Sequence, residues 1–532
     1  MKAVVLYDTT LRDGAQAEGV SFSLDDKIRI AQRLDSLGID YIEGGWPGSN
    51  PKDMEFLQRW SDYGLKHATL CAFGSTRRAG TPVVEDPNLR AIVESGVTVA
   101  TIFGKSWDFH VTNVLRATLD ENLAMIEESV RFLRSKGLRV FYDGEHFFDG
   151  YRANPEYAIR TLEAAASAGA EVLVLCDTNG GFLPQYVSPI VTEVVKRFPG
   201  VDIGVHMHND AGTGVANTLV GVDSGAKHVQ GTMNGYGERA GNADLCTIIA
   251  NLKLKMGVDC VTEEQLAQLT KTSHFIDEIA NRRPNPHQPY VGRSVFTHKA
   301  GVHVNALLKH PITYEHIDAS LVGNRRRVVV SELSGGSNIR YKAREFDLNI
   351  DDDPDRIASI LNSVKNLEYE GYSFEGAEAS FELMLRRTLG LHEDLFELEG
   401  FRLIIEKKGN NGPPVAEATV KIRIGDETIH TAAEGDGPVN ALDNALRKAL
   451  IQVYPEIEKI ALTDYKVRVL DAESGTAAKV RVLIESTSGE YPWGTVGVST
   501  NIIEASWRAL ADSIEYGLLR KPGMSAQKDP VD

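Results

Sequence analysis

The sequence predicts an α/β protein with an N-terminal (β/α)8 barrel, mostly helical linker subdomains and a C-terminal α+β domain made of two βββα units. Two observations predict this arrangement. Eight short apolar runs alternate with amphipathic stretches in the first half of the chain, and a pattern of three strand-like runs and a helix occurs twice near its end. Eight strands with their helices in about 250 residues match the size of such a barrel. An open doubly wound sheet is the alternative, but it rarely needs eight such regular units.

Each predicted barrel strand is a continuous apolar run, as expected where helices cover the outside of a parallel sheet. The runs begin at Ala3, Ile39, His67, Val97, Arg139, Glu171, Asp202 and His228. Helical signals lie between them. The first predicted helix starts at a capping-box-like Ser23–Asp26 and ends before Gly38, with apolar residues at helical spacing between.

The pattern changes after about residue 275. The prolines of residues 281–289 disfavour helix just before them, so this stretch is predicted to be a loop. A histidine-bearing segment follows from Phe296, and a mixed helical region follows that. From about residue 400, two successive βββα patterns suggest a pseudo-symmetric module. The predicted divisions are therefore 1–275 for the barrel, 276–400 for the linker subdomains and 401–532 for the C-terminal domain.

Composition and charge exclude several classes of partner. The 532 residues are 42% hydrophobic and 25% charged, which is average for a soluble globular protein. A net charge of −17 argues against binding nucleic acid or an acidic membrane surface, since both would repel the chain. The four cysteines form no CxxC pair, and no apolar run is long enough for a signal core or a membrane helix. We therefore expect a cytoplasmic protein.

Two histidines and an aspartate form a candidate metal site. His206 and His208 are two residues apart near the end of a predicted strand, so their side chains face the same way. Asp13 follows the first strand, and the strand ends of a parallel barrel converge on one mouth. Two imidazoles and one carboxylate form a divalent-metal site with open positions. Asn242, after the eighth strand, supplies a further oxygen or bonds to a loop.

Other ionisable residues near predicted strand ends are candidates for catalysis. Arg12 stays charged and offers fixed donors that can stabilise an oxyanion. The other interpretation is a buried salt bridge to Glu43 or Glu238, and the two are compatible, since a paired arginine is better positioned. Glu145 and Thr178 also follow strands. His303 lies outside the barrel. It is either a polar linker residue or, if its segment folds over a barrel mouth, a general base.

Three motifs together resemble one enzyme family. Leu11–Gln16 (LRDGAQ), His206–Asp210 (HMHND) and Gly237–Asn242 (GERAGN) are similar to signatures of the DRE-TIM metallolyases, and the set is found in α-isopropylmalate, homocitrate and citramalate synthases. The segment HKAGVHVNA resembles their linker, and the βββα repeat resembles their regulatory domain. The segments from Thr101, Phe141 and Cys176 are most similar to the citramalate-forming members.

The resemblance implies a Claisen-type condensation of acetyl-CoA with pyruvate, giving citramalate and CoA. This reaction would be the first step of a threonine-independent route to isoleucine. A divalent ion (Mg²⁺, Mn²⁺ or Zn²⁺) would polarise the carbonyl of pyruvate. The resemblance also implies a homodimer, and it suggests isoleucine as an effector of the C-terminal domain.

The same resemblance assigns roles to individual residues. The implied metal ligands are Asp13, His206 and His208, with Asn242 close to the ion. The implied catalytic residues are Arg12 for the developing alkoxide and Glu145 and His303 for deprotonating the acetyl methyl group. The implied substrate-binding residues are Gln16, Glu43 and Thr178. The chain departs from many relatives two positions after the linker histidine, where it has Asn305 in place of an aspartate.

Several alternatives remain open. A homocitrate synthase must hold a second substrate carboxylate, for which Lys105 is available, and an isopropylmalate synthase needs room for a branched side chain, which Phe103 and Trp107 would restrict. A lyase cleaving hydroxymethylglutaryl-CoA usually lacks the C-terminal module. A non-catalytic effector-binding protein is a more remote alternative. Effector binding is predicted at two glycine-containing turns, 435–437 and 494–497, or these glycines serve only as turn residues.

Overall fold

The computed structural model describes residues 4–350, 353–392, 394–407, 410, 414–489 and 492–520, except the side chains of 472–474. The chain forms two compact units. The first comprises Met1–Phe296 and Ile317–Arg325, and the second comprises Thr297–His316 and Arg326–Asp532.

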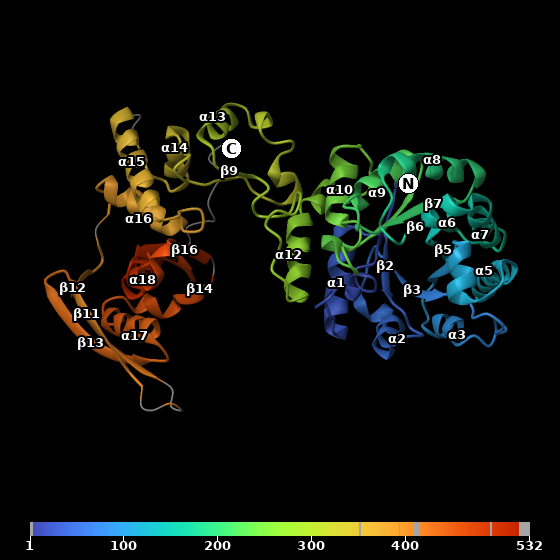
Figure 1. The fold of residues 1–532 in the computed structure, drawn as a ribbon, viewed down its shortest axis with the longest axis horizontal. Coiled ribbons are helices and arrows are strands. Elements are labelled where there is room, and N and C mark those ends of the chain that lie inside the picture. The colour runs from blue at the N-terminus through green and yellow to red at the C-terminus, as the bar shows by residue number, and fades with distance from the viewer. Residues whose placement is uncertain are drawn as a thin grey trace. The chain divides into compact units, whose positions relative to one another are not determined.

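The first unit is built on a closed barrel of parallel strands in sequence order, β1 to β8 (Figure 1). All eight predicted runs form strands, so the prediction of a (β/α)8 barrel is confirmed. The strands are β1 (Val5–Asp8), β2 (Tyr41–Gly45), β3 (Thr69–Ser75), β4 (Val99–Lys105), β5 (Arg139–Glu145), β6 (Val172–Asp177), β7 (Asp202–Met207) and β8 (His228–Gly231).

Helices surround this barrel. They are α1 (Leu24–Leu37), α2 (Pro51–Gln58), α3 (Pro87–Glu94), α4 (Asp108–His110), α5 (Leu119–Ser135), α6 (Phe147–Ala153), α7 (Pro155–Ser167), α8 (Pro184–Arg197), α9 (Gly214–Asp223), α10 (Leu245–Leu254), α11 (Glu263–Leu266) and α12 (Leu269–Ile279). The first of them begins at the predicted capping box of Ser23 and Asp26 and ends at Gly38, whose φ of 91° is left-handed. Apolar residues facing the strands, such as Leu34 and Ile126, are fully buried.

The second unit begins with a mostly helical region. Its elements are β9 (Thr297–His298), α13 (Gly301–Lys309), β10 (Arg327–Val328), α14 (Gly336–Glu345), α15 (Pro354–Glu370) and α16 (Glu378–Thr388). The basic run 325–327 contributes two ion pairs. Arg326 pairs with the buried Glu315, and Arg327 pairs with Glu378.

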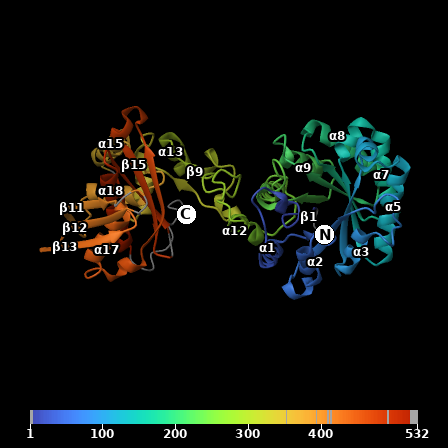
Figure 2. The ribbon, with the colours of Figure 1, turned by 60° about the horizontal axis from the view of Figure 1, so that its bottom comes forward.

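The C-terminal part contains two antiparallel three-stranded sheets, each followed by a helix (Figure 2). The first set is β11 (Glu397–Glu406), β12 (Val415–Ile424), β13 (Glu427–Gly435) and α17 (Pro438–Leu450). The second is β14 (Ala461–Val469), β15 (Val480–Thr487), β16 (Pro492–Ser499) and α18 (Ile502–Leu519). The two predicted βββα units are thus present. Both helices contribute to one hydrophobic core, for example through Leu446 and Leu510.

The prediction of a turn at residues 494–497 is wrong, because these residues lie inside β16 and pair with β15. Their glycines have a packing role instead. A Cβ atom at Gly497 would lie 2.0 Å from the carbonyl oxygen of Ala505, and one at Gly494 would lie 1.9 Å from that of Gly376. Only glycine allows the helix and the preceding loop to approach the strand so closely.

None of the helices in the described ranges combines the length and the apolar character that a membrane span requires.

Candidate active site

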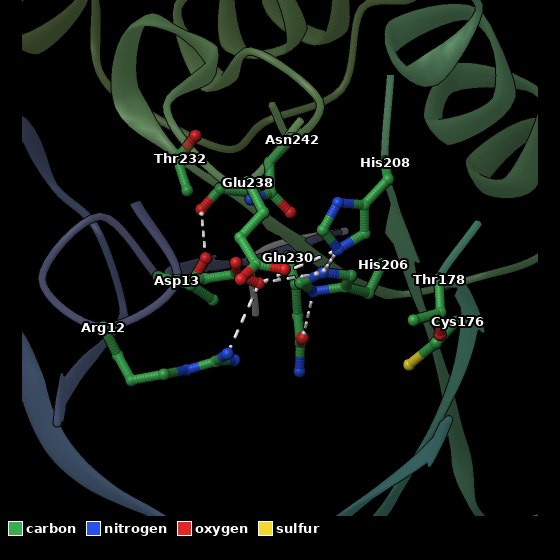
Figure 3. A network of polar contacts seen from close by, with 12 residues as sticks. Arg12, Asp13, Cys176, Thr178, His206, His208, Gln230, Thr232, Glu238 and Asn242 are labelled. Carbon is green, nitrogen blue, oxygen red and sulfur yellow. Dashed lines mark hydrogen bonds and ion pairs between the residues drawn. The ribbon is translucent and has the colours of Figure 1, made fainter. Parts of the chain in front are cut away.

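Asp13, His206 and His208 meet at the carboxyl-terminal end of the barrel strands (Figure 3). Asp13 lies in the turn after β1, His206 lies near the end of β7, and His208 follows that strand. The Asp13 Oδ2 atom is 3.4 Å from His206 Nε2 and 3.9 Å from His208 Nε2, and the two Nε2 atoms are 3.4 Å apart. All three residues are buried. Three potential ligand atoms therefore converge from strands far apart in the sequence.

The chemistry of this cluster fits a divalent cation. Two imidazole nitrogens and a carboxylate oxygen are a common ligand set for such ions. Asn242 adds a second indication, because its Oδ1 atom is buried and has no hydrogen-bond partner among the described residues. Its amide nitrogen donates to the Tyr236 carbonyl, and its backbone forms an isolated antiparallel bridge with His208. A buried acceptor without a partner is costly, and a bound ligand would satisfy it.

Arg12 is held beside this cluster by two carboxylates. Its Nε atom donates to Glu43 Oε1 at 2.5 Å, and its Nη1 atom lies 3.4 Å from Asp13 Oδ2. Of the two predicted salt-bridge partners, Glu43 is therefore the one that pairs with Arg12. Burial opposes the charge of Arg12, but attraction to Glu43 and Asp13 outweighs it and raises the pKa of the guanidinium. The group is thus charged and held in a fixed orientation.

Electrostatics also set the protonation of the cluster. Burial disfavours the Asp13 carboxylate, but Arg12 and His206 overcome this and hold its pKa well below the usual range. Burial likewise opposes protonation of His206, while its hydrogen bond to Asp13 raises its pKa. Burial and the neighbouring His206 lower the pKa of His208 to about 4. Asp13 is therefore an anion, and His208 is a neutral imidazole available as a ligand.

Sequence reasoning missed a buried polar network below these residues. Tyr7 donates to Glu43 Oε2 at 2.9 Å and is bonded to Thr101 Oγ1 at 2.7 Å. The Gln230 amide lies between His206 Nδ1, at 2.8 Å, and Asp143 Oδ1, at 3.1 Å. The alternation of side chains along a strand could have identified Asp143. It precedes Glu145 by two residues, so the two side chains lie on the same face of the strand.

Glu145 and Thr178 lie at the ends of β5 and β6. Glu145 forms an ion pair with Lys105, which ends the neighbouring strand β4 and is opposite it in the register. Thr178 Oγ1 accepts a hydrogen bond from the backbone nitrogen of His146 at 2.8 Å. His146 has a φ of 58°, which is unusual for a residue with a side chain and turns the chain sharply after the strand. Lys105 is thus bound to Glu145 rather than free for a ligand.

Gln16 and His303 have other surroundings. The Gln16 side chain is exposed, and Arg12 contacts Asp13, Glu43 and the Phe73 ring. His303 belongs to the second unit, where it is exposed on α13. Its ring stacks on Tyr314 with centroids 4.2 Å apart. Their roles stay predictions.

Three aromatic side chains form a wall beside Arg12. The Arg12 guanidinium lies 3.7 Å from the centre of the Phe73 ring, and Phe73 stacks on Phe103 at 5.4 Å. Trp46 meets both rings edge-on at 5.7 Å. At the far side of Phe103, the Lys105 Nζ atom lies 5.4 Å from the centre of the Phe103 ring. The aromatic wall therefore runs from Arg12 to the Lys105–Glu145 pair.

On the side of β8 and α12, a cavity of about 600 Å³ adjoins Asn242. Its lining includes the Gly237–Asn242 loop and the two arginines Arg282 and Arg283. The cavity leaves room beside the cluster for part of a large substrate.

Family models match the chain over most of its length. An HMGL-like model matches residues 3–276, a model of the homocitrate synthase post-HMGL domain matches 290–371, and the LeuA allosteric (dimerisation) domain matches 375–518. The barrel and its cluster thus define an HMGL-like enzyme with an added LeuA-type domain.

Full-length relatives narrow this class. The (R)-citramalate synthase of Geobacter sulfurreducens is 54% identical over 99% of this chain and 100% of its own length. The (R)-citramalate synthase of Aquifex aeolicus is 52% identical over 97% and 98% of the two chains. A 2-isopropylmalate synthase of Methanocaldococcus jannaschii is 30% identical over 97% and 95%. The chain belongs to the (R)-citramalate synthase family.

Proposed function

We propose that this enzyme condenses acetyl-CoA with pyruvate and water to give (R)-citramalate and CoA, as the first step of a threonine-independent route to isoleucine. The observation that carries the proposal is the buried cluster of Asp13, His206 and His208 beside Arg12, in a chain 54% identical to an (R)-citramalate synthase. A cytoplasmic location is part of the proposal.

The metal site would bind and orient pyruvate. Asp13, His206 and His208 would hold a divalent ion, with Asn242 close by, and the bound ion would supply Lewis-acid polarisation of the keto group. Thr178 would contact the substrate carboxylate, and Gln16 would help to orient the substrate. The charged guanidinium of Arg12 would stabilise the alkoxide that develops on the keto oxygen. Glu43 holds Arg12 in place, so little reorganisation would be needed in the transition state.

The acetyl methyl group must lose a proton. Glu145 is the proposed base within the barrel, and its ion pair with Lys105 would position it. His303 of the second unit, which stacks on Tyr314, is the second residue proposed for this deprotonation. It would act on the barrel of the other subunit in a homodimer. The nucleotide part of acetyl-CoA would use the cavity next to Asn242.

The ion pair of Lys105 also bears on the homocitrate alternative. A 2-oxoglutarate substrate needs a free cation for its second carboxylate, and here the neighbouring Glu145 already binds Lys105. A second substrate carboxylate would have to share the Lys105 ammonium with Glu145, which would bring two negative charges close together. This favours a 2-oxo acid without a second charge.

The test compares CoA thiol release with pyruvate, 3-methyl-2-oxobutanoate and 2-oxoglutarate, each with Mn²⁺ and acetyl-CoA. We expect the highest kcat/KM for pyruvate, with roughly tenfold or greater discrimination against the branched acid. A higher value for either other acid would identify an isopropylmalate or a homocitrate synthase. Release with none of them would favour the non-catalytic alternative.

Replacing Phe103 with alanine should open the aromatic wall. We expect kcat/KM for 3-methyl-2-oxobutanoate to rise by about tenfold, because a buried methylene is worth about 1 kcal/mol or more in such a pocket. The value for pyruvate should fall only slightly. Phe109→Ala, at a residue that is 53% exposed, is the control. An unchanged ratio of the two acids in Phe103→Ala would show that this ring does not line the substrate pocket.

The C-terminal domain is the proposed site of dimerisation and of isoleucine inhibition. Because residues 494–497 lie inside β16, the turn 435–437 before α17 is the remaining candidate for the effector carboxylate. We expect isoleucine to inhibit the full-length enzyme and to slow amide hydrogen exchange within residues 397–520. Slowing confined to residues 4–296 would contradict this placement, and sedimentation at micromolar concentration would test the dimer.

A further inference from the structure

The ring nitrogen of His206 that faces away from Asp13, Nδ1, contacts another buried side chain. Its Nδ1 atom faces the Oε1 atom of Gln230 at 2.8 Å, and the two residues are partners in the register of β7 and β8. Gln230 is completely buried, so water does not compete for this contact. The opposite ring atom, Nε2, faces Asp13. The proton on the ring therefore decides which nitrogen is free to bind a cation.

The orientation of the Gln230 amide decides where that proton lies. A glutamine amide has one end that only accepts and one that only donates. Asp143 Oδ1 lies 3.1 Å from Gln230 Nε2 and His228 Nε2 lies 3.5 Å from it, so the donating end faces two groups that can accept. Burial lowers the pKa of His228 to about 3, which keeps that ring neutral and able to accept.

A reversed amide would lose the bond from its nitrogen to Asp143 Oδ1. It would also favour the other tautomer of the ring, because its nitrogen would donate to an unprotonated His206 Nδ1. The observed orientation instead makes the Gln230 oxygen an acceptor for an Nδ1 proton. His208 has no such contact, because its Nδ1 atom is buried without a hydrogen-bond partner among the described residues. The arrangement is thus specific to one of the two histidines.

We propose that Gln230 and Asp143 are positioning residues that hold His206 in the tautomer presenting Nε2 to a divalent cation. The proposal rests on the metal site of the proposed function and adds to it two residues from β8 and β5. Partners of this kind fix the ring and raise the basicity of the ligand, and losing them typically costs about 10–100-fold in metal affinity.

The test measures Mn²⁺ affinity of the full-length protein by competition with a chelator. Gln230→Met keeps the length of the side chain but removes both hydrogen bonds, and we expect it to weaken Mn²⁺ binding by about 10–100-fold. Gln230→Glu keeps an acceptor for Nδ1 and should restore most of the affinity. Asp143→Leu, which removes the group that orients Gln230, should weaken binding as well, and Asp143→Asn should weaken it less.

A second readout separates tautomer control from a general loss of structure. Nitrogen NMR of ¹⁵N-histidine-labelled, metal-free protein, recorded at a pH high enough for the His206 ring to be neutral, should show an Nδ1 proton on His206 in the wild type and a mixed tautomer in Gln230→Met. Gln32→Met is the control at an exposed position, since that glutamine on α1 donates to the Tyr63 carbonyl. It should leave both readouts unchanged.

The outcomes distinguish the two proposals. Wild-type affinity and an unchanged tautomer in Gln230→Met would overturn the positioning role while leaving the metal site intact. The positioning role would also be overturned if Mn²⁺ binding were weak in Gln230→Met and equally weak in Gln230→Glu. A wild-type protein that binds neither Mn²⁺ nor Zn²⁺ would overturn both the metal site and the positioning role.

Discussion

Replacing Arg12 with lysine is expected to lower kcat by about 10²–10³-fold, the typical cost of losing one preorganised donor to an oxyanion. Lysine keeps the positive charge but loses the forked donors that let Arg12 contact Glu43 and still face the site. Because the alkoxide charge exists only in the transition state, KM for pyruvate should change much less than kcat.

The control for this variant is Arg139→Lys. Arg139 begins β5 at the opposite end of the barrel and pairs with Glu171. It should lose little activity, since that end of a TIM barrel serves stability. Steady-state kinetics with pyruvate as the varied substrate would measure both variants. Equal losses in the two would argue that Arg12 acts only through the fold.

Replacing Asp13 with asparagine should cause the other large effect. The only anion in the three-residue cluster is lost, and both histidines lose their charged partner. We expect at least about a 10³-fold loss of kcat, because metal stabilisation of the transition state is worth several kcal/mol and each 1.36 kcal/mol is tenfold. Mn²⁺ should no longer be retained after desalting.

Asp40→Asn is the matched control for Asp13. Its carboxylate accepts from the backbone nitrogen of Leu6, near the start of β1, and is remote in sequence from every proposed ligand. Metal content by elemental analysis and thermal unfolding should be measured for both variants. An Asp13→Asn protein with full metal content and full activity would disprove the proposed metal site.

The barrel was predictable because its signals are local. A buried parallel strand needs a continuous apolar run, and the runs from Ala3 to His228 are separated by helices with clear caps and stops. The cluster was predictable for a related reason. The spacing of His206 and His208 fixes their common direction, and barrel closure brings them to Asp13.

Other features depend on contacts between distant segments. Gln230 and Asp143 carry no motif of their own, and only the closed barrel reveals that Gln230 contacts both His206 and Asp143. The glycine at 497 suggests a turn in the sequence, yet it is required by a helix passing over a strand. The choice between Glu43 and Glu238 as the partner of Arg12 likewise needed the closed barrel.

The division of the chain has a consequence for how the two units are connected. The chain leaves the barrel unit after Phe296, returns for Ile317–Arg325 and then leaves again. The returning segment is anchored, since Thr270 donates to the Val322 carbonyl at 2.7 Å and Asn324 donates to that of Tyr290 at 2.9 Å. Residues 297–316, which include His303, are therefore attached to the barrel unit at both of their ends. A single proteolytic cut between residues 297 and 316 would leave the fragments joined through this anchor, so a nicked enzyme should migrate intact until it is denatured.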